Sequence, residues 1–167
     1  KNNKTYNKKT NKRISALLGV HVFGNALKID KVLKLCKIRN IEIIEDASES
    51  FGTYYKKGLL NKKYSGTISK IGCLSFNGNK IISSGGGGMI ITNNYSIAKK
   101  ARYLINQAKD NSLKFIHNNV GYNFRISNLH AAIGLAQIRR INKILNKKKF
   151  IRNFYKNHIK NIDGFEL

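Results

Sequence analysis

Apolar residues in the first third of the chain follow a strand, helix, strand order. A near-continuous apolar run at residues 14–24 (ISALLGVHVFG) is typical of a strand buried on both faces. Residues 28–40 place Ile, Val, Leu and Cys at helical spacing, and residues 41–46 (IEIIED) form the next short apolar run. This order predicts a βαβ unit and therefore a parallel sheet.

The rest of the chain predicts two more strands followed by helices. Apolar runs at residues 71–77 and 88–93 indicate strands, and residues 96–107 have the period of an amphipathic helix. Residues 126–159 are predicted to form one long helix or two. We therefore expect an α/β layered domain whose last third is helical.

Polar residues mark the ends of these elements. Residues 1–13 are basic and have no periodicity, so we expect a solvated or disordered lead-in. Either Ser127 or Asn128 can provide the N-cap of the C-terminal helices. The chain contains no proline, so its turns must depend on Gly and Asn.

The formal net charge of +24 invites a nucleic-acid interpretation, but the basic residues do not support a dedicated site. Lysine exceeds arginine by 25 to 7, whereas base and phosphate recognition favours arginine. The basic residues are also scattered, apart from short runs such as residues 147–149. Lys, Asn and Ile are all abundant and share A/T-rich codons, so genome composition explains the bias.

The apolar segments, cysteines and histidines of the sequence indicate the cellular compartment and bear on disulfides and metal sites. No apolar run approaches the roughly 20 residues that a membrane helix needs, and the first 13 residues lack the apolar segment of a secretory signal. Cys36 and Cys73 are flanked by apolar residues, which favours buried free thiols over a disulfide or a metal pair. From these features we expect a cytoplasmic protein without a membrane partner. We also expect no metal, because the histidines are scattered: His21, His117, His130 and His158.

Asp46 and Lys80 are the residues whose positions indicate chemistry. In open α/β sheets, ligands bind at the carboxyl ends of the strands; Asp46 ends one predicted strand, and Lys80 closely follows another. The alternatives are a helix N-cap at Asp46 or Ser48 and a solvated surface lysine at position 80. A desolvated lysine can act as a nucleophile or base. Glycines 85–88 let the backbone approach a ligand, although they lack the residue order of a phosphate loop.

Four stretches of the sequence, in this order and at these separations, resemble the DegT/DnrJ/StrS-type sugar-nucleotide aminotransferases: VHVFGNALKID, EDASESFGTYY, GCLSFNGNKIISSGGGGMIITNN and VGYNFRISNLHAAIGLAQI. Enzymes of this family use pyridoxal phosphate and have the three-layer αβα architecture of fold type I. The resemblance runs from Ile14 to the end of the chain. The stretches SFNGNK, GGGGMI and NQAKD are most similar to the branch that makes UDP-4-amino-4,6-dideoxy-N-acetyl sugars for legionaminic acid or bacillosamine.

The resemblance implies a role for five residues. Lys80 matches the Schiff-base lysine, and Asp46 matches the carboxylate that pairs with the pyridine nitrogen of the cofactor. Glu49 stands where many relatives have a glutamine near the cofactor ring oxygen. Ser75 matches a serine that binds the cofactor phosphate, and Asn123 matches an asparagine that reaches the phosphate from the other subunit of a dimer.

The resemblance also implies a reaction and a domain organisation. The reaction is transamination of a nucleotide-linked 4-keto-6-deoxy sugar, with glutamate as amino donor, for surface-glycan biosynthesis by a homodimer. Residues 14–126 are expected to be part of the large, cofactor-binding domain with its mainly parallel sheet, and residues 127–167 to lead toward a small domain.

Members of the family are longer than this chain. They have a further N-terminal portion, with a phosphate-binding loop and a residue that stacks on the cofactor ring, and a C-terminal small domain. We therefore expect an incomplete and weakly active aminotransferase. The alternatives are a non-catalytic remnant of such an enzyme and, less favoured, a basic nucleic-acid-binding protein.

Overall fold

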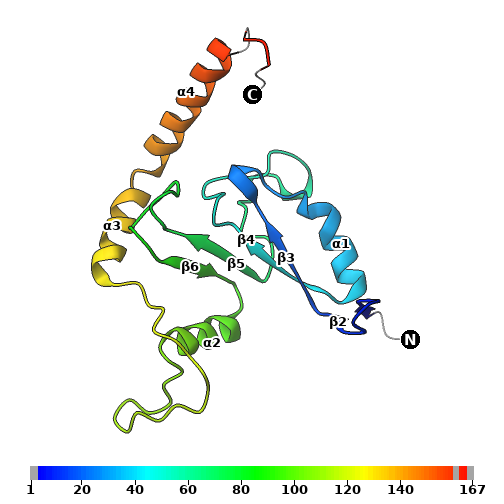
Figure 1. Ribbon diagram of the computed structural model, residues 1–167, viewed down its shortest axis with the longest axis vertical. Helices are drawn as coiled ribbons and strands as arrows, with labels where there is room; N and C mark the ends of the chain where they lie inside the picture. Colours follow the sequence, from blue (N-terminus) through cyan, green and yellow to red (C-terminus); the bar gives the residue numbers. More distant parts are fainter. Residues whose placement is uncertain (1–3, 160–161, 165–167) are drawn as a thin grey trace.

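The computed structural model describes residues 4–159 and 162–164, and its centre is a four-stranded sheet (Figure 1). The strands lie in the order β3-β4-β5-β6. β3, β4 and β5 are parallel, and β6 runs antiparallel to β5. The predicted mainly parallel sheet is therefore confirmed, with these bounds: β3 (Ala16–Val20), β4 (Glu42–Asp46), β5 (Ile71–Ser75) and β6 (Gly88–Ile91).

Helix α1 (Ile29–Arg39) connects β3 to β4 and covers one face of the sheet, as predicted. Its buried residues Ile29 and Cys36 form a core with Ile43 of β4. The helix ends at Asn40, which adopts a left-handed conformation (φ 52°, ψ 46°) and donates its backbone N–H to the Cys36 carbonyl. Asn tolerates this conformation better than most residues, which explains a sharp stop without glycine.

Helix α2 (Tyr95–Ile105) lies toward the opposite face, so the domain has the three layers that its sequence indicates. The side chain of Asn94 caps the helix by accepting a hydrogen bond from the Ile97 amide. Ile97 lines, with Ile71 and Ile90 of the sheet, an open and almost wholly apolar cavity of about 440 Å³. No residue of α2 is buried, whereas two residues of α1 are, so α2 is packed against the sheet more loosely than α1.

The prediction that residues 14–24 form a strand buried on both faces is wrong in two respects. The strand ends at Val20, and a 3₁₀ turn, η1 (Val22–Gly24), follows. Leu17 packs toward α1, whereas Leu18 is 61% exposed. β3 is the edge strand beside β4, and among the described residues no element covers its second face.

The C-terminal third forms two helices, α3 (Asn128–Ile138) and α4 (Ile141–Ile159), rather than one. Ser127 is the N-cap, and its side chain accepts a hydrogen bond from the His130 amide. Near the junction of the helices, Ile138 and Ile141 pack against a second core, and α4 then extends away from the sheet (Figure 1). The buried residues of that core are Ala47, Leu74, Phe76 and Ile82.

The lead-in, for which we expect no regular structure, contains a small antiparallel hairpin of β1 (Thr5–Tyr6) and β2 (Arg13–Ile14). Residues 7–13 are exposed, in agreement with a solvated segment. Cys36 and Cys73 are both free thiols; Cys36 is buried, as predicted, whereas Cys73 is only half-buried. No helix within the described ranges is both long enough and apolar enough to cross a membrane.

Candidate functional site

The carboxyl ends of β4 and β5 bring three polar side chains to one face of the sheet. Asp46 pairs with Cys73 in the parallel register, so their side chains point to the same face, and Ser75 follows two residues further along β5. Asp46 and Ser75 are both half-buried. Both candidate residues therefore lie at the edge of the sheet where α/β domains bind ligands.

The carboxylate of Asp46 is held in place by Ser48. Its Oδ1 accepts hydrogen bonds from the Ser48 amide, at 3.0 Å, and from the Ser48 hydroxyl. No helix begins here, so the N-cap alternative for Asp46 and Ser48 is wrong. The Ser48 hydroxyl is the main cause that lowers the pKa of Asp46; burial opposes it, and the nearby charge of Lys80 adds to the lowering. Asp46 is therefore ionised at neutral pH.

Lys80 differs from a solvated surface lysine. Its side chain is only 16% exposed, and its Nζ lies 3.4 Å from Oε1 of Glu49. The other oxygen of Glu49 accepts a hydrogen bond from the Phe23 amide at 3.0 Å, and this amide is the main cause that lowers the pKa of Glu49. Lys70 is the matched contrast, because it pairs with Glu42 but is 54% exposed.

The segment that carries Lys80 is tied to the sheet and to α3. The Lys80 amide donates to the Asn77 carbonyl at 3.1 Å, and the Ser84 amide donates to the Phe76 carbonyl at 2.9 Å. The side chain of Gln137 in α3 accepts a hydrogen bond from the Ser83 amide. Within the glycine run, residues 85 and 87 have φ of 84° and 88°, which explains why glycine is needed in this turn.

Asn123 does not join the other four candidates. It is exposed, and it lies in a stretch whose backbone pairs with the end of α2, since the Phe124 amide donates to the Ile105 carbonyl. In the described part of the chain, its side chain makes no hydrogen bond to Asp46, Glu49 or Lys80. The structure thus unites Asp46, Glu49 and Lys80, with Ser75 on the neighbouring strand.

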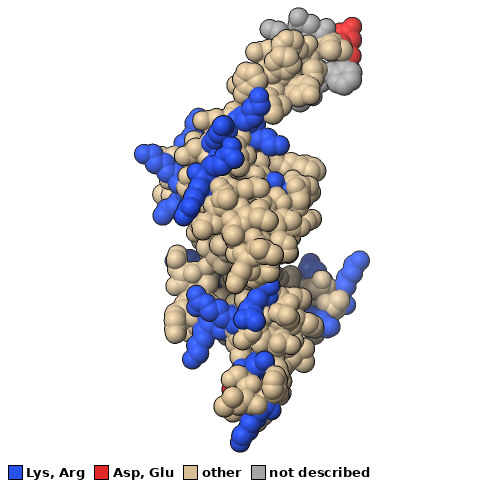
Figure 2. Space-filling model, turned by 90° about the vertical axis from the view of Figure 1, so that its left-hand side faces the viewer, with Lys and Arg blue, Asp and Glu red and all other residues tan. Residues whose placement is uncertain are grey.

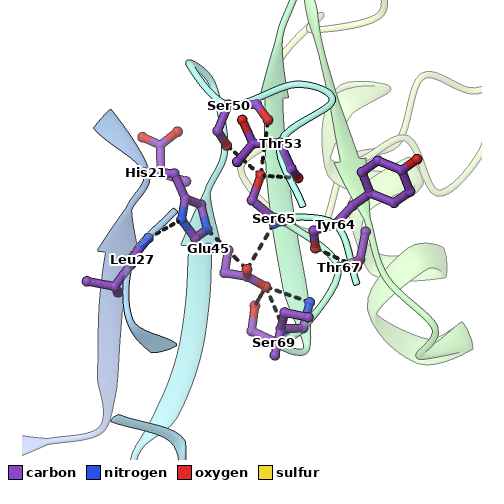
Figure 3. A network of polar contacts seen from close by, with 12 residues as sticks. His21, Leu27, Glu45, Ser50, Thr53, Tyr64, Ser65, Thr67 and Ser69 are labelled. Carbon is purple, nitrogen blue, oxygen red and sulfur yellow. Dashed lines mark hydrogen bonds and ion pairs between the residues drawn. The ribbon is translucent and has the colours of Figure 1, made fainter. Parts of the chain in front are cut away.

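Glu45 and His21 are further polar residues at this end of the sheet, and the sequence interpretation assigned them no role (Figure 3). Both are fully buried. The Glu45 carboxylate accepts hydrogen bonds from His21 Nε2 (3.1 Å), from the amides of Gly66 (2.9 Å), Ile68 (2.8 Å) and Ser69 (2.7 Å), and from the Ser69 hydroxyl (2.9 Å). One signal was available in the sequence. Glu45 lies two positions after Ile43 in a strand, and residues two positions apart point to the same face of a sheet, so Glu45 lies on the buried face with Ile43.

The molecular surface carries its positive charge broadly rather than in one groove. In Figure 2, Lys and Arg side chains are spread over the middle and lower parts of the face, and few acidic side chains are visible on it. Within the described residues, no cluster of three or more His, Cys, Asp or Glu side chains could hold a metal ion. The local chemistry available beside β4 is therefore a shielded lysine that pairs with Glu49 and whose charge acts on the nearby Asp46.

The model of the DegT/DnrJ/EryC1/StrS aminotransferase family matches residues 3–167. A protein of Bacillus subtilis (strain 168) named "Putative pyridoxal phosphate-dependent aminotransferase EpsN" is 39% identical over 89% of this chain and 37% of its own length. The GDP-perosamine synthase of Vibrio cholerae is 38% identical over 91% of this chain and 40% of its own length. The chain thus spans about two fifths of the relatives it matches.

A solved structure shares the fold. Helicobacter pylori PseC, an aminotransferase involved in the biosynthesis of pseudoaminic acid, superposes with a TM-score of 0.79. The superposition covers 89% of this chain and 39% of that protein, at 23% sequence identity. The predicted fold class is therefore confirmed.

Proposed function

The chain belongs to the DegT/DnrJ/EryC1/StrS aminotransferase family, and from this premise we propose that it holds pyridoxal phosphate and aminates a nucleotide-linked keto sugar. The observation that supports this most directly is the ion pair of the shielded Lys80 with Glu49, beside the ionised Asp46 at the end of β4. A lysine and a carboxylate in these positions are what the family's motifs lead one to expect.

The residues present fit the cofactor. Asp46 would face the pyridine nitrogen, because an ionised and fixed carboxylate keeps that nitrogen protonated. Lys80 would carry the cofactor covalently, Ser75 would bind its phosphate, and Glu49 would lie near the ring oxygen. Once bound, pyridoxal phosphate supplies an electron sink for the bond that breaks at the substrate carbon.

The chain's own residues then handle the proton. The Nζ of Lys80, when free of the cofactor, would accept the proton from the substrate carbon and would then deliver it to the cofactor carbon. Glu49 stabilises the protonated Nζ from 3.4 Å, and the Phe23 amide holds Glu49 in that position. Asp46 stays ionised throughout, because Ser48 donates two hydrogen bonds to its Oδ1.

The proposed substrates follow from the family and from the named relatives. One relative is named for GDP-perosamine, whereas the stretches around Lys80 resemble the branch that uses UDP-linked N-acetyl sugars. We therefore propose a nucleotide-linked 4-keto-6-deoxy sugar as acceptor and glutamate as donor, for surface-glycan biosynthesis. Assays with a GDP-linked and a UDP-linked sugar decide which nucleotide the substrate carries.

The position of Asn123 supports a second subunit in the proposed enzyme. Its exposed position apart from Lys80 suits a residue that serves the phosphate of a partner's site in a homodimer. Residues 14–126 would then form part of the cofactor-binding domain, and residues 127–167 would lead toward a small domain. Mixing Lys80→Ala and Asn123→Ala chains should restore one intact site per mixed dimer; no restoration, or a monomer in light scattering, would argue against a shared site.

The test of the proposed reaction is amination by the chain loaded with pyridoxal phosphate. Glutamate and either a GDP-linked or a UDP-linked 4-keto-6-deoxy sugar are supplied, and the amino sugar is detected by mass spectrometry. Lys80→Ala should lower the rate by about 10²–10⁴-fold or more, and Lys70→Ala should not. Equal rates for the two variants would contradict the role of Lys80, and loaded chain without any product would support the non-catalytic remnant.

A further inference from the structure

The backbone amide and both ring nitrogens of His21 have hydrogen-bonding partners, although the residue is fully buried. Its backbone amide donates to the Asp46 carbonyl at 3.0 Å. Its Nε2 lies 3.1 Å from Oε1 of Glu45, and the Leu27 amide donates to its Nδ1 at 2.9 Å (Figure 3). The residue is therefore bonded to β4 on one side and to the loop after η1 on the other.

The partners of the ring fix its tautomer. Nδ1 accepts a hydrogen bond from a backbone amide, which has no acceptor of its own to offer, so Nδ1 carries no proton. The single ring proton is then on Nε2 and is donated to Glu45. A neutral imidazole with one donor and one acceptor thus joins two separate parts of the structure.

Nδ1, the acceptor of the ring, is connected to Lys80 through a chain of contacts. The bond from Leu27 closes the loop of residues 22–27, which contains Phe23. Phe23 has a left-handed backbone (φ 49°, ψ 40°), rare for a bulky residue, and in this conformation its amide donates to Glu49. Glu49 in turn pairs with Lys80. The loop that positions Glu49 therefore depends on Nδ1 of His21.

Nε2, the donor of the ring, is connected through Glu45 to Asp46 and to the segment before β5. Glu45 precedes Asp46 in β4. Its carboxylate accepts hydrogen bonds from the amides of Gly66, Ile68 and Ser69, which lie just before β5. A bond from Nε2 therefore helps to fix the end of β4 relative to the segment that leads into β5. The backbone bond from His21 to the Asp46 carbonyl holds the same strand end.

We propose that His21 is a positioning residue that aligns Asp46 with the Glu49–Lys80 pair, acting through Glu45 on one side and through the 22–27 loop on the other. The inference rests on the proposed function, because the aligned groups are those that would hold pyridoxal phosphate. His21 itself touches neither cofactor nor substrate in this account.

The test separates the two sides of the ring with a pair of substitutions. In His21→Asn, the side-chain oxygen takes the place of Nδ1 and can still accept from Leu27, but the donor to Glu45 is lost. In His21→Gln, the side-chain nitrogen takes the place of Nε2 and can still donate to Glu45, but the acceptor for Leu27 is lost. The exposed His117, whose ring hydrogen-bonds the Gln107 carbonyl, provides the control His117→Gln.

Amide hydrogen exchange of the cofactor-free chain is the first readout. We expect His21→Asn to speed exchange at Gly66, Ile68 and Ser69, and His21→Gln to speed exchange at Phe23 and Leu27, each by about tenfold or more. The other set of amides should be unchanged in each variant. The same exchange pattern in both variants would overturn the proposal, because the two sides of the ring would then not act separately. Unfolding of both variants would overturn it as well, because His21 would then support the whole fold rather than the alignment of the site.

Affinity for pyridoxal phosphate is the second readout. Both variants should bind the cofactor about tenfold or more weakly than the wild-type chain, and His117→Gln should bind it equally well. Unchanged affinity in both His21 variants would overturn the positioning role even if exchange changes. A wild-type chain that binds no pyridoxal phosphate would instead contradict the proposed function, while the exchange pattern would still decide whether His21 joins the two parts.

Discussion

The carboxyl end of β4 and helix α4 are both rich in polar side chains, yet they are stabilised in opposite ways. At β4, Glu45 is fully buried and bonds to residues that lie 21 to 24 positions away in the sequence. None of the 19 residues of α4 is buried. The contacts between its side chains are local, such as Phe154 stacked on His158 with ring centroids 4.1 Å apart and Lys147 over the ring of Phe150.

The difference shows where the chain fixes geometry. Long-range bonds from a buried carboxylate hold two strands and a loop in one arrangement, and an unpaired buried group would be costly, so the arrangement is specific. Contacts three or four residues apart stabilise a helix without fixing where it lies. The candidate site is on the first kind of structure, which suits a site that must hold its groups in position.

Removal of the Glu45 carboxylate should have the largest effect. Glu45→Ala leaves the amides of Gly66, Ile68 and Ser69 without their buried acceptor, and we expect the free energy of unfolding to fall by about 3 kcal/mol or more. The measurement is urea denaturation. Glu42→Ala is the control on the same strand, because its pair with Lys70 is exposed and should contribute about 1 kcal/mol or less. Equal losses for both variants would remove the distinction between the two regions.

A methyl group at Gly72 should have the next largest effect. An added Cβ there would lie 1.8 Å from the Gly66 carbonyl oxygen, in the segment that Glu45 holds. We expect Gly72→Ala to lower the free energy of unfolding by about 1–3 kcal/mol. Gly78→Ala is the matched control, since nothing lies within 4 Å of its added Cβ. A Gly72→Ala chain as stable as Gly78→Ala would show that the 65–69 segment is free to shift.

Acid should weaken the site in a way that depends on Ser48. The pKa of Asp46 is lowered in the folded chain, mainly by the Ser48 hydroxyl, so the ionised form stabilises the fold. This contribution is present above the unfolded pKa of about 3.9 and is lost as the pH falls through the lower folded value. Ser48→Ala should move the pKa of Asp46 up toward its ordinary value, measured by NMR titration. An unchanged pKa would mean that Ser48 is not its main cause.

Truncation of an α4 aromatic should have the smallest effect. Phe154 is 52% exposed and contacts its own helix, so Phe154→Ala should change the free energy of unfolding by no more than about 0.5 kcal/mol. Urea denaturation beside Glu45→Ala provides the comparison. A loss as large as that of Glu45→Ala would show that α4 contributes long-range stability after all.

The sequence predicted those parts of the structure that depend on local pattern. The short apolar run IEIIED located β4, and the helical spacing of Ile29, Val32 and Cys36 located α1. Of the two N-cap candidates, Ser127 and Asn128, the structure shows Ser127 to be the N-cap. Asp46 and Lys80 were chosen as site candidates from their places after strands and from the family's motifs. In the structure, Lys80 pairs with Glu49 and its charge acts on Asp46, and the roles of both residues stay predictions.

The parts that sequence reasoning missed depend on contacts between distant segments. Nothing near His21 shows that its ring meets Glu45, because 24 positions separate them. The apolar run around Leu18 predicted burial on both faces, but burial depends on which elements cover an edge strand. A basic lead-in likewise gave no local sign of the hairpin at Thr5–Tyr6 and Arg13–Ile14, whose strands are only two residues long.

The proposed function depends on the attachment of pyridoxal phosphate to Lys80, and borohydride reduction locates that attachment at a single residue. The chain is incubated with pyridoxal phosphate, reduced and digested, and the labelled lysine is located by mass spectrometry. We expect label on the peptide that contains Lys80, its loss in Lys80→Ala and its retention in Lys70→Ala. Label spread over the other lysines, or unchanged labelling of Lys80→Ala, would contradict the claim.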